Sequence, residues 1–583
     1  MKKKVMVIML TAVMVVLTLA TGCSKPSAAP AQPITPKVYR WVTGSDTTTL
    51  NNQFSASTTI QDLYAYSHSG LYIGIPSPDG KGVQWVADIA DGDPQQVDKD
   101  GYVWRINIRK EAKWHNGDPI NADTFMYSWK MLIDPKLVNA MSNFLYDRFI
   151  KIVNAREYFF QLEDGAPKVA WEDVGIKKVG EYSLELTLTQ KSNPEYVKRH
   201  FTDRSTFPVY EKIYEAGMNA DRTSTTWGAS LDQYMGCGAY YYDSWTVGAE
   251  HIFVKNPNHW LSNLYKFDRV EVRISADRNA RVQMFENGEL SVLSLDSVTL
   301  DRYRDDPRVK TYTGITPYHL EINSANTEHP IFANPNFRKA IYYAIDRKTI
   351  GDILGVLPAA YYINHQAPGY DGMSYRETPE AKAIVPPNYG YDPALAKKYF
   401  DQALAEQKVS NVTVEITYVD SESGDKAMSE LFEQSWPKIF DGKISVTLRA
   451  IPNAVFSPTA NWRENPNGMQ MNYNDWGASL SRVFPYAAFN YFHSGYASRP
   501  NAYITPRFDA AFKACDSEEA KSNPKLMVQR TAELEKIYIE DVINVPLWQE
   551  FVYTLYSEDL ILPCSVYVPG LGYGSTFGDM KVK

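Results

Sequence analysis

The chain has 583 residues, of which 44% are hydrophobic and 22% charged, and its formal net charge is −8. This length exceeds that of one ordinary domain and predicts two or three lobes. The negative charge argues against general nucleic-acid binding, which needs a basic surface to release counterions. The 40 Tyr and 13 Trp provide large apolar faces with a polar group, which suit both a core and a ligand-binding cleft.

The first 22 residues are typical of a secretion signal, because a basic start at 2–4 precedes an apolar run over 5–19. This run is shorter than the about 20 residues of a membrane-spanning helix. The residues before Cys23 resemble the lipobox of bacterial lipoproteins, although Ala20 stands where Leu is usual. The resemblance implies a lipid on Cys23 and a chain anchored at the extracytoplasmic face of a bacterial membrane. A plain secretion signal with an incidental cysteine is the alternative.

Residues 23–36 are small and rich in proline, which predicts an extended tether before the folded body. The body begins with a predicted strand, loop and helix over 38–74. Alternating apolar and polar residues then predict a half-buried strand over 101–109, preceded by a turn. After a second turn, Asn121 caps a predicted helix that ends near Asp134, before a proline.

Strands and helices continue to alternate along the rest of the chain, which predicts an α/β fold. Alternation indicates a strand-rich block over 179–188 and a hairpin over 238–254. The helical period returns over 337–354, and Asp392-Pro393 opens a further helix that reaches Leu404. Two more alternating strands are predicted, over 412–418 and 444–451.

Several stretches resemble one family, the extracellular solute-binding proteins of ABC transporters, and within it the oligopeptide-binding group known as family 5. The resemblance is strongest over 100–135, which follows the family's signature of strand, turn and helix with a small departure at Thr124-Phe125. The other matching stretches are collinear with the family over almost the whole mature chain: 238–240, 255–260, 285–290, 337–347 and 390–393.

The resemblance implies a two-lobed fold like that of type II periplasmic binding proteins. The first lobe is expected to comprise 37–320 and 546–583, with an extra subdomain inserted at about 67–192. The second lobe is expected to comprise 321–545. Such lobes close on the ligand as a hinge, so that binding shifts the equilibrium between open and closed states.

The resemblance also points to a ligand anchor in the second lobe. Peptide-binding relatives usually hold the α-ammonium group of the ligand with an Asp three residues after a Trp. Here the Trp is Trp476, and Ser479 stands at the position of the Asp. A hydroxyl group accepts a hydrogen bond but supplies no countercharge. Three hypotheses follow: Asp475 replaces the anchor, another carboxylate does, or the ligand has no free amino terminus. An oligosaccharide held by Trp476, Ser479 and Asn474 fits the third.

A second candidate region is 545–551, where relatives cross back into the first lobe and place an aromatic side chain near the ligand. Trp548 and Phe551 are therefore predicted ligand contacts, with packing at the hinge as the alternative. In either case this segment is expected to join the two lobes.

Catalytic and metal-binding motifs are absent from the sequence. It contains no GxxxxGK[ST], HExxH or GxSxG pattern, and Cys237, Cys515 and Cys564 are not spaced as zinc ligands. A glycoside hydrolase needs two carboxylates in one cleft, which residue counts do not test. We therefore expect no enzyme activity and no cofactor or metal.

The prediction from sequence is a monomeric receptor that captures a peptide or another small polar solute for ABC permease subunits in the membrane. The alternatives are an oligosaccharide-binding importer receptor and a ligand-sensing lipoprotein without transport. Neither nucleic acid nor a cofactor is an expected partner.

Overall fold

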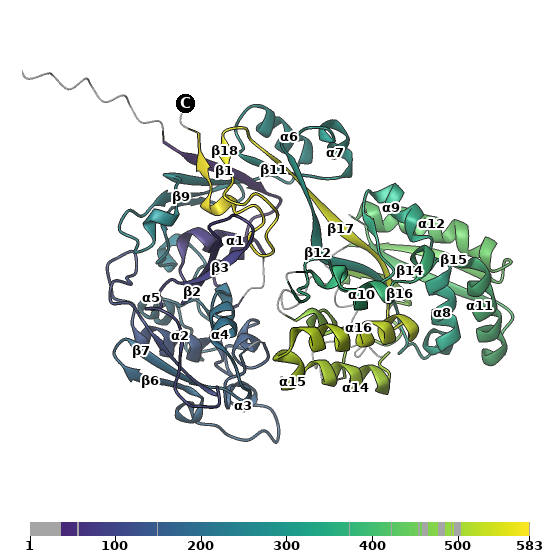
Figure 1. The fold of residues 1–583 in the computed structure, drawn as a ribbon, viewed down its shortest axis with the longest axis horizontal. Helices are drawn as coiled ribbons and strands as arrows, with labels where there is room; N and C mark the ends of the chain where they lie inside the picture. The colour runs from purple at the N-terminus through teal and green to yellow at the C-terminus, as the bar shows by residue number, and fades with distance from the viewer. Residues whose placement is uncertain are drawn as a thin grey trace, which may run out of the picture. The chain divides into compact units, whose positions relative to one another are not determined.

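The longest sheet of the protein joins strands from distant parts of the chain (Figure 1). The computed structural model describes residues 36–54, 58–148, 150–371, 373–420, 422–452, 455–456, 465–475, 484–490, 492–494 and 503–581. In these residues the sheet has the order β11-β17-β12-β16-β14-β15, and β13 pairs with β17. The strands are β11 (Val292–Leu295), β12 (Val309–Ile322), β13 (Leu357–Pro358), β14 (Val412–Val419), β15 (Ile444–Ile451), β16 (Met471–Asp475) and β17 (Val545–Tyr556).

The two long strands β12 and β17 pair antiparallel and form the middle of this sheet. At one end β17 pairs with β11, and at the other end β12 pairs with β16. Strand β14 then pairs parallel with both β15 and β16. The carboxyl ends of β14 and β16 therefore point the same way, which is the arrangement that places ligand sites in open α/β sheets.

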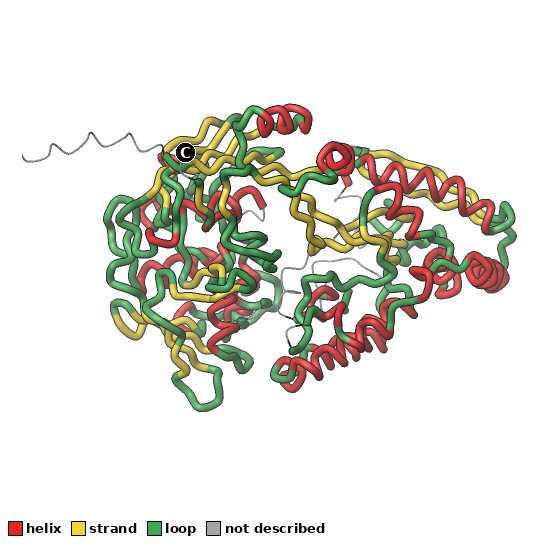
Figure 2. Tube along the Cα trace, turned by 45° about the horizontal axis from the view of Figure 1, so that its top comes forward, coloured by secondary structure: helices red, strands yellow, loops and turns green. Residues whose placement is uncertain are grey.

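Helices cover the part of the sheet that contains β14 and β15 (Figures 1 and 2). Their apolar faces pack with the strands into one buried cluster that includes Phe337, Phe400, Ile416 and Trp436. The helices of this region are α8 (Pro335–Tyr343), α9 (Arg347–Leu354), α11 (Pro393–Gln407) and α12 (Ser423–Ile439). A neighbouring cluster forms around α10 (Pro379–Ala383), α14 (Pro506–Cys515), α15 (Glu518–Lys521) and α16 (Pro524–Glu540).

The N-terminal half of the chain forms smaller sheets around its own core. One sheet has the order β1-β10-β9-β8, another β4-β5-β7-β6, and β2 pairs with β3. These strands are β1 (Val38–Thr43), β2 (Tyr72–Pro76), β3 (Val83–Ala87), β4 (Gln95–Gln96), β5 (Val103–Asn107), β6 (Ile176–Gly180), β7 (Ser183–Thr187), β8 (Tyr240–Thr246), β9 (Glu250–Lys255) and β10 (Arg269–Ile274). Near the C-terminus, β18 (Leu560–Ile561) pairs with β19 (Asp579–Met580).

Helices of this half pack against the same core, which includes Leu63, Trp104, Trp129 and Phe253. They are α1 (Thr58–Ser67), α2 (Ala122–Leu132), α3 (Ala155–Phe160), α4 (Pro194–His200) and α5 (Glu211–Ala216). Two further helices, α6 (Arg278–Glu286) and α7 (Ser297–Tyr303), pack with β11 in a separate small cluster.

The predicted signature over 100–135 is confirmed as strand, turn and helix. The Asp98 carboxylate accepts hydrogen bonds from the backbone N–H groups of Gly101, Tyr102 and Val103, which closes the turn before β5. Asn121 caps α2 and forms a capping box with Thr124. Thr124, which departs from the family pattern, thus satisfies a backbone group at the start of the helix.

Two predicted regions are confirmed, each as two elements. The strand-rich block predicted over 179–188 is formed by the end of β6 and by β7, which pair as a hairpin because the chain turns between Gly180 and Ser183. The helical region predicted over 337–354 consists of two helices, α8 and α9. The break occurs because Asp346 caps α9 through the Thr349 N–H, and the buried Arg347 guanidinium takes up the carbonyls of Tyr342 and Ile345. The predicted hairpin over 238–254 and the helix opened by Asp392-Pro393 are confirmed.

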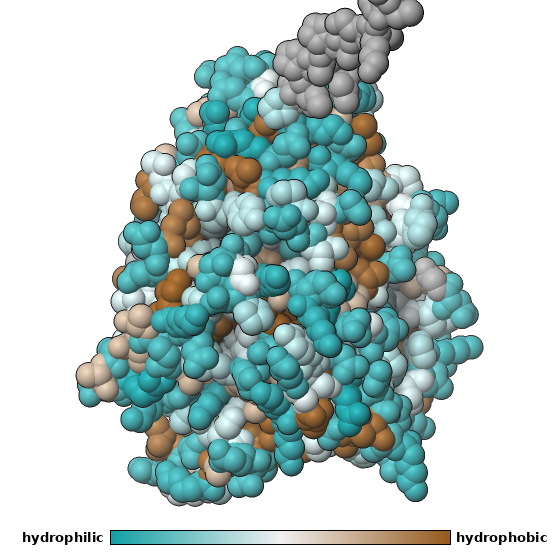
Figure 3. Space-filling model, turned by 90° about the vertical axis from the view of Figure 1, so that its left-hand side faces the viewer, coloured by the Kyte–Doolittle hydropathy of each residue, from teal (hydrophilic) through white to brown (hydrophobic). Residues whose placement is uncertain are grey.

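One side of the molecule is mostly hydrophilic, with hydrophobic side chains in small separate groups (Figure 3). In the described part of the chain, every helix is too short or too polar to cross a membrane. Cys237, Cys515 and Cys564 are buried free thiols. The predicted lipid site, Cys23, lies outside the described residues.

Candidate functional site

The candidate site lies where β17, β12 and β16 run side by side. The register places Tyr318 of β12 directly between Asp475 of β16 and Trp548 of β17. Residues directly opposite one another on neighbouring strands point to the same face of a sheet. The rings of Tyr318 and Trp548 accordingly stack, with centroids 4.8 Å apart and planes 11° apart.

Glu550 follows Trp548 by two positions on β17 and therefore lies on the same face. Its carboxylate lies over Gly314, where a Cβ atom would come within 2.7 Å of the Glu550 Oε2 atom. Burial, together with the negative charge of Asp475, raises the pKa of the Glu550 carboxyl. The absence of a side chain at Gly314 thus makes room for a carboxylate next to the aromatic pair.

A second acidic segment comes from the start of α12. Glu422 immediately precedes the helix and Asp425 lies in its first turn. Acidic side chains are favoured at this position by the helix dipole. Burial raises the pKa of Asp425 to about 7, and the charges of Glu422 and Asp475 contribute to the rise. Helix α12 begins just after the carboxyl end of β14, so this acidic segment reaches the end of β16 where Asp475 lies.

These four residues, Glu422, Asp425, Asp475 and Glu550, are called the acidic cluster below. Burial and then their charges raise the pKa of the Tyr318 hydroxyl. Within the described parts of the chain, no Lys, Arg or His forms an ion pair with any of the four carboxylates. Clustered negative charge without a countercharge raises the free energy of the folded protein, and such sites are frequently functional.

The acidic cluster is suited to binding a cationic group. A ligand ammonium would supply the countercharge that the described residues do not. It is not arranged as a metal centre: among the described residues, no group of three or more His, Cys, Asp or Glu side chains is placed to hold a metal ion.

The structure brings together two of the residues predicted as ligand contacts, Asp475 and Trp548. Trp548 is 4% exposed and packs in the core, stacked on Tyr318, so its indole presents little open surface. Asn474 and Phe551 are each one position out of phase with these residues and point to the other face. Trp476 and Ser479 lie outside the described residues.

Four residues of the site were not predicted from the sequence: Tyr318, Glu422, Asp425 and Glu550. Glu550 follows Trp548 by two residues, a spacing that places both side chains on one face of a strand, but the segment 545–551 was not predicted to be a strand. No comparable local signal marks Tyr318 or Asp425, because their proximity depends on the order of strands in the sheet.

The sequence matches the model of the bacterial extracellular solute-binding proteins, family 5 (middle region), over residues 84–498. The chain belongs to this family. The family is one of solute-binding receptors rather than enzymes, and its members act outside the cytoplasm.

Curated members of the family are similar to most of the chain. The dipeptide-binding protein DppE of Bacillus subtilis is 25% identical over 460 residues, which cover 78% of this chain and 77% of that protein. The dipeptide-binding protein of Lactococcus lactis is 24% identical over 507 residues, covering 83% and 86% of the two chains.

Solved structures show the same fold. OppA of Listeria monocytogenes bound to peptide superposes with a TM-score of 0.71 at 22% identity, covering 94% of this chain and 99% of that one. Haemophilus influenzae OppA in complex with the peptide RPPGFSPFR also gives a TM-score of 0.71, at 19% identity, with 94% and 100% covered. The fold is thus that of the oligopeptide-binding proteins with a type II periplasmic binding fold.

Proposed function

We propose that this family member captures peptides with a free amino terminus outside the cytoplasm and delivers them to a membrane importer. The observation that carries the proposal is the acidic cluster beside the Tyr318–Trp548 stack, which lacks a countercharge among the described residues. Dipeptide- and oligopeptide-binding relatives support the choice of ligand class. In this proposal the carboxylates of Asp475, Glu550 and Asp425 replace the acidic anchor that Ser479 does not provide.

The acidic cluster favours a peptide over an oligosaccharide. Sugars are bound by neutral polar groups and by open aromatic faces, whereas Trp548 is buried and covered by Tyr318. A sugar hydroxyl would also leave the negative charges of Asp475 and Glu550 unpaired in a partly desolvated site. A peptide ammonium compensates them.

The proposal includes closure of two lobes, 37–320 with 546–583 and 321–545, around the peptide. Strands β12 and β17 run between the two parts and carry Tyr318, Trp548 and Glu550. A ligand held by these strands would contact the region that changes conformation on closure, so that binding shifts the hinge equilibrium. We further propose that a lipid on Cys23 and the tether over 23–36 hold this receptor near the permease.

The test compares the binding of free and N-acetylated alanine pentapeptides by isothermal titration calorimetry. Acetylation removes the ammonium charge, and a hydrogen bond to a charged group is worth about 1.5–3 kcal/mol. We therefore expect acetylation to weaken binding by at least about tenfold. Equal affinity for the two peptides would refute recognition of the ammonium group by the acidic cluster.

The variant Glu550→Gln tests the same point from the protein side. It should weaken binding of the free peptide and reduce the difference between free and acetylated forms. Glu433→Gln is the matched control, because Glu433 is exposed on α12 and the substitution makes the same change in net charge. Peptide uptake by a strain lacking the protein, with and without complementation, separates transport from sensing.

A further inference from the structure

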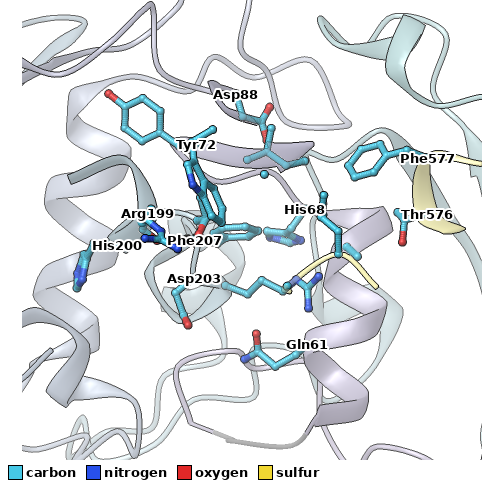
Figure 4. A pocket seen from close by; sticks show the side chains of 18 of the residues that line it. Gln61, His68, Tyr72, Asp88, Arg199, His200, Asp203, Phe207, Thr576 and Phe577 are labelled. Carbon is cyan, nitrogen blue, oxygen red and sulfur yellow. Dashed lines mark hydrogen bonds between the residues drawn. The ribbon is translucent and has the colours of Figure 1, made fainter. Parts of the chain in front are cut away.

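A cavity of about 360 Å³ lies in the N-terminal half of the molecule, apart from the acidic cluster (Figure 4). Its walls come from α1, from the β2–β3 hairpin, from α4 and the following short helix Arg204–Thr206, and from the C-terminal segment 569–577. Aromatic side chains form much of the apolar wall: Tyr72, Trp85, Phe144, Phe207, Tyr265 and Phe577.

Three arginines, Arg148, Arg199 and Arg204, line this cavity. Among the described residues, no side chain forms a hydrogen bond or ion pair with the guanidinium of Arg204. The Nε atom of Arg148 is buried without a hydrogen-bond partner, and its guanidinium lies 4.6 Å from the centre of the Phe144 ring. The Arg199 guanidinium lies 5.2 Å from the centre of the Trp85 ring.

The two carboxylates of the cavity wall already have donors within the protein. Asp203 accepts a hydrogen bond from the Ser205 N–H at 3.0 Å. Asp88 accepts one from the Trp260 indole N–H at 2.8 Å, and burial raises its pKa to about 6. Neither carboxylate lies within 4.0 Å of the Arg148 or Arg204 nitrogen atoms as an ion pair. The charge of Asp203 acts on both Arg148 and Arg204, and that of Asp62 acts on Arg204, but among the described residues no ion pair within 4.0 Å joins these groups. The guanidinium donors of Arg148 and Arg204 therefore line the cavity without a direct carboxylate partner.

The histidines of the wall do not add positive charge at neutral pH. Burial lowers the pKa of His68 well below its usual value, and it lowers the pKa of His200 to about 3. The three arginines thus supply all the positive charge among the residues that line the cavity.

The cavity lies close to the predicted second lobe. Tyr196, on helix α4 of its wall, donates a hydrogen bond from its hydroxyl to the Lys521 carbonyl at 3.3 Å. The same ring packs edge-on against Phe484, with centroids 5.1 Å apart. Helix α4, which carries Arg199 and His200 of the cavity wall, thus contacts the predicted second lobe.

The geometry points to the cavity as a subsite for a carboxylate group of the ligand, with Arg204 and Arg148 as its binding residues and the aromatic wall as the contact for the adjoining aliphatic chain. This inference rests on the proposed peptide-binding function, and it adds a second recognition point of opposite charge to the acidic cluster. Arginine binds carboxylates well because its planar group donates parallel hydrogen bonds. The carboxylate is either the C-terminus of the peptide or a Glu or Asp side chain.

The test uses wild-type protein and a matched set of pentapeptides with a free amino terminus. The peptides of the set have either a free or an amidated C-terminus, and either Glu or Gln at a central position. The first comparison tests recognition of the C-terminal carboxylate, and the second tests recognition of an acidic side chain. We expect loss of the recognised carboxylate to weaken binding by about tenfold, as for one charge-assisted contact. This peptide comparison uses only the wild-type protein, so it does not depend on whether a variant folds.

The second arm uses Arg204→Gln, Arg204→Lys and Arg148→Gln. Arg204→Gln should abolish the preference for the carboxylate peptide and leave the affinity for its neutral analogue unchanged, and Arg204→Lys should retain part of the preference. Arg304→Gln is the charge-matched control, because Arg304 is exposed at the end of α7, does not line the cavity and pairs with Asp301. The expected control result is an unchanged preference.

The possible failures are distinguishable. If free peptides bind better than acetylated ones but neither carboxylate matters, or if the arginine variants keep the wild-type preference, the carboxylate subsite is refuted and the proposed function stands. If no pentapeptide binds the wild-type protein, the proposed function fails and this inference fails with it.

Discussion

Replacing Asp425 by Asn removes one negative charge from the acidic cluster while nearly preserving the volume of the side chain. In the wild-type protein this carboxyl is largely buried and lies near the charges of Glu422 and Asp475. We therefore expect Asp425→Asn to stabilise the empty protein at alkaline pH and to weaken its binding of peptides. Stability and binding should thus change in opposite directions.

The magnitude follows from the pKa of Asp425, which is raised from 3.8 to about 7. Because the folded protein retains this proton at pH values where the unfolded chain has lost it, the free energy of unfolding falls as the pH rises from about 4 to about 7. One pH unit corresponds to about 1.4 kcal/mol, so the full interval corresponds to about 4 kcal/mol. The Asn variant lacks this loss, and should gain about 2–4 kcal/mol over the wild type between these pH values.

The assay is urea unfolding of both proteins, followed by tryptophan fluorescence, at about pH 4 and about pH 8. At each pH, the free energy of unfolding of the wild type is subtracted from that of the variant. The change of this difference between the two pH values reports on Asp425, because the contributions of other titrating groups cancel. Glu433→Gln serves as the control and should show no such change. If Asp425→Asn has the same effect at both pH values, or destabilises the protein more at the higher one, the reasoning about the acidic cluster is wrong.

Three further predictions concern packing and local geometry. Gly314→Ala places a Cβ atom 2.7 Å from Oε2 of Glu550, so the carboxylate must move, and peptide affinity should fall severalfold in calorimetry with little change in the urea midpoint. Glu535→Gln removes a buried charge that accepts from the N–H groups of Tyr362 and Ile363 and pairs with Arg376, and should cost about 3–5 kcal/mol of unfolding free energy. Glu533→Gln, on the exposed side of α16, is the control and should change the free energy of unfolding little. Equal losses of stability in the Glu533 and Glu535 variants would contradict a structural role for the buried Glu535 charge. Cys237, Cys515 and Cys564 are buried thiols, so a thiol reagent should react with them only in denaturant, and rapid reaction in the native protein would contradict their burial.

The sequence by itself determined the local elements and the family. Asn121 and Asp392 mark the starts of two helices because their side chains satisfy free backbone N–H groups, a requirement that only neighbouring residues need to meet. The hairpin of β8 and β9 follows from alternation in adjacent segments. The break between helices α8 and α9 was less predictable from the sequence. It depends on Arg347, whose guanidinium donates hydrogen bonds to backbone carbonyls in the core, including that of Pro546, far along the chain.

Only the tertiary structure decided the composition of the candidate site. Asp425, Asp475 and Glu550 are on three separate elements, and nothing in their local sequences relates them. They meet because β16 lies between β12 and β14, and because the register sets Tyr318 opposite both Asp475 and Trp548. The arginine-lined cavity likewise combines segments from both ends of the chain. Charge neighbours of this kind depend on strand order and register, which are set by burial over the whole sheet and not by residues close in sequence.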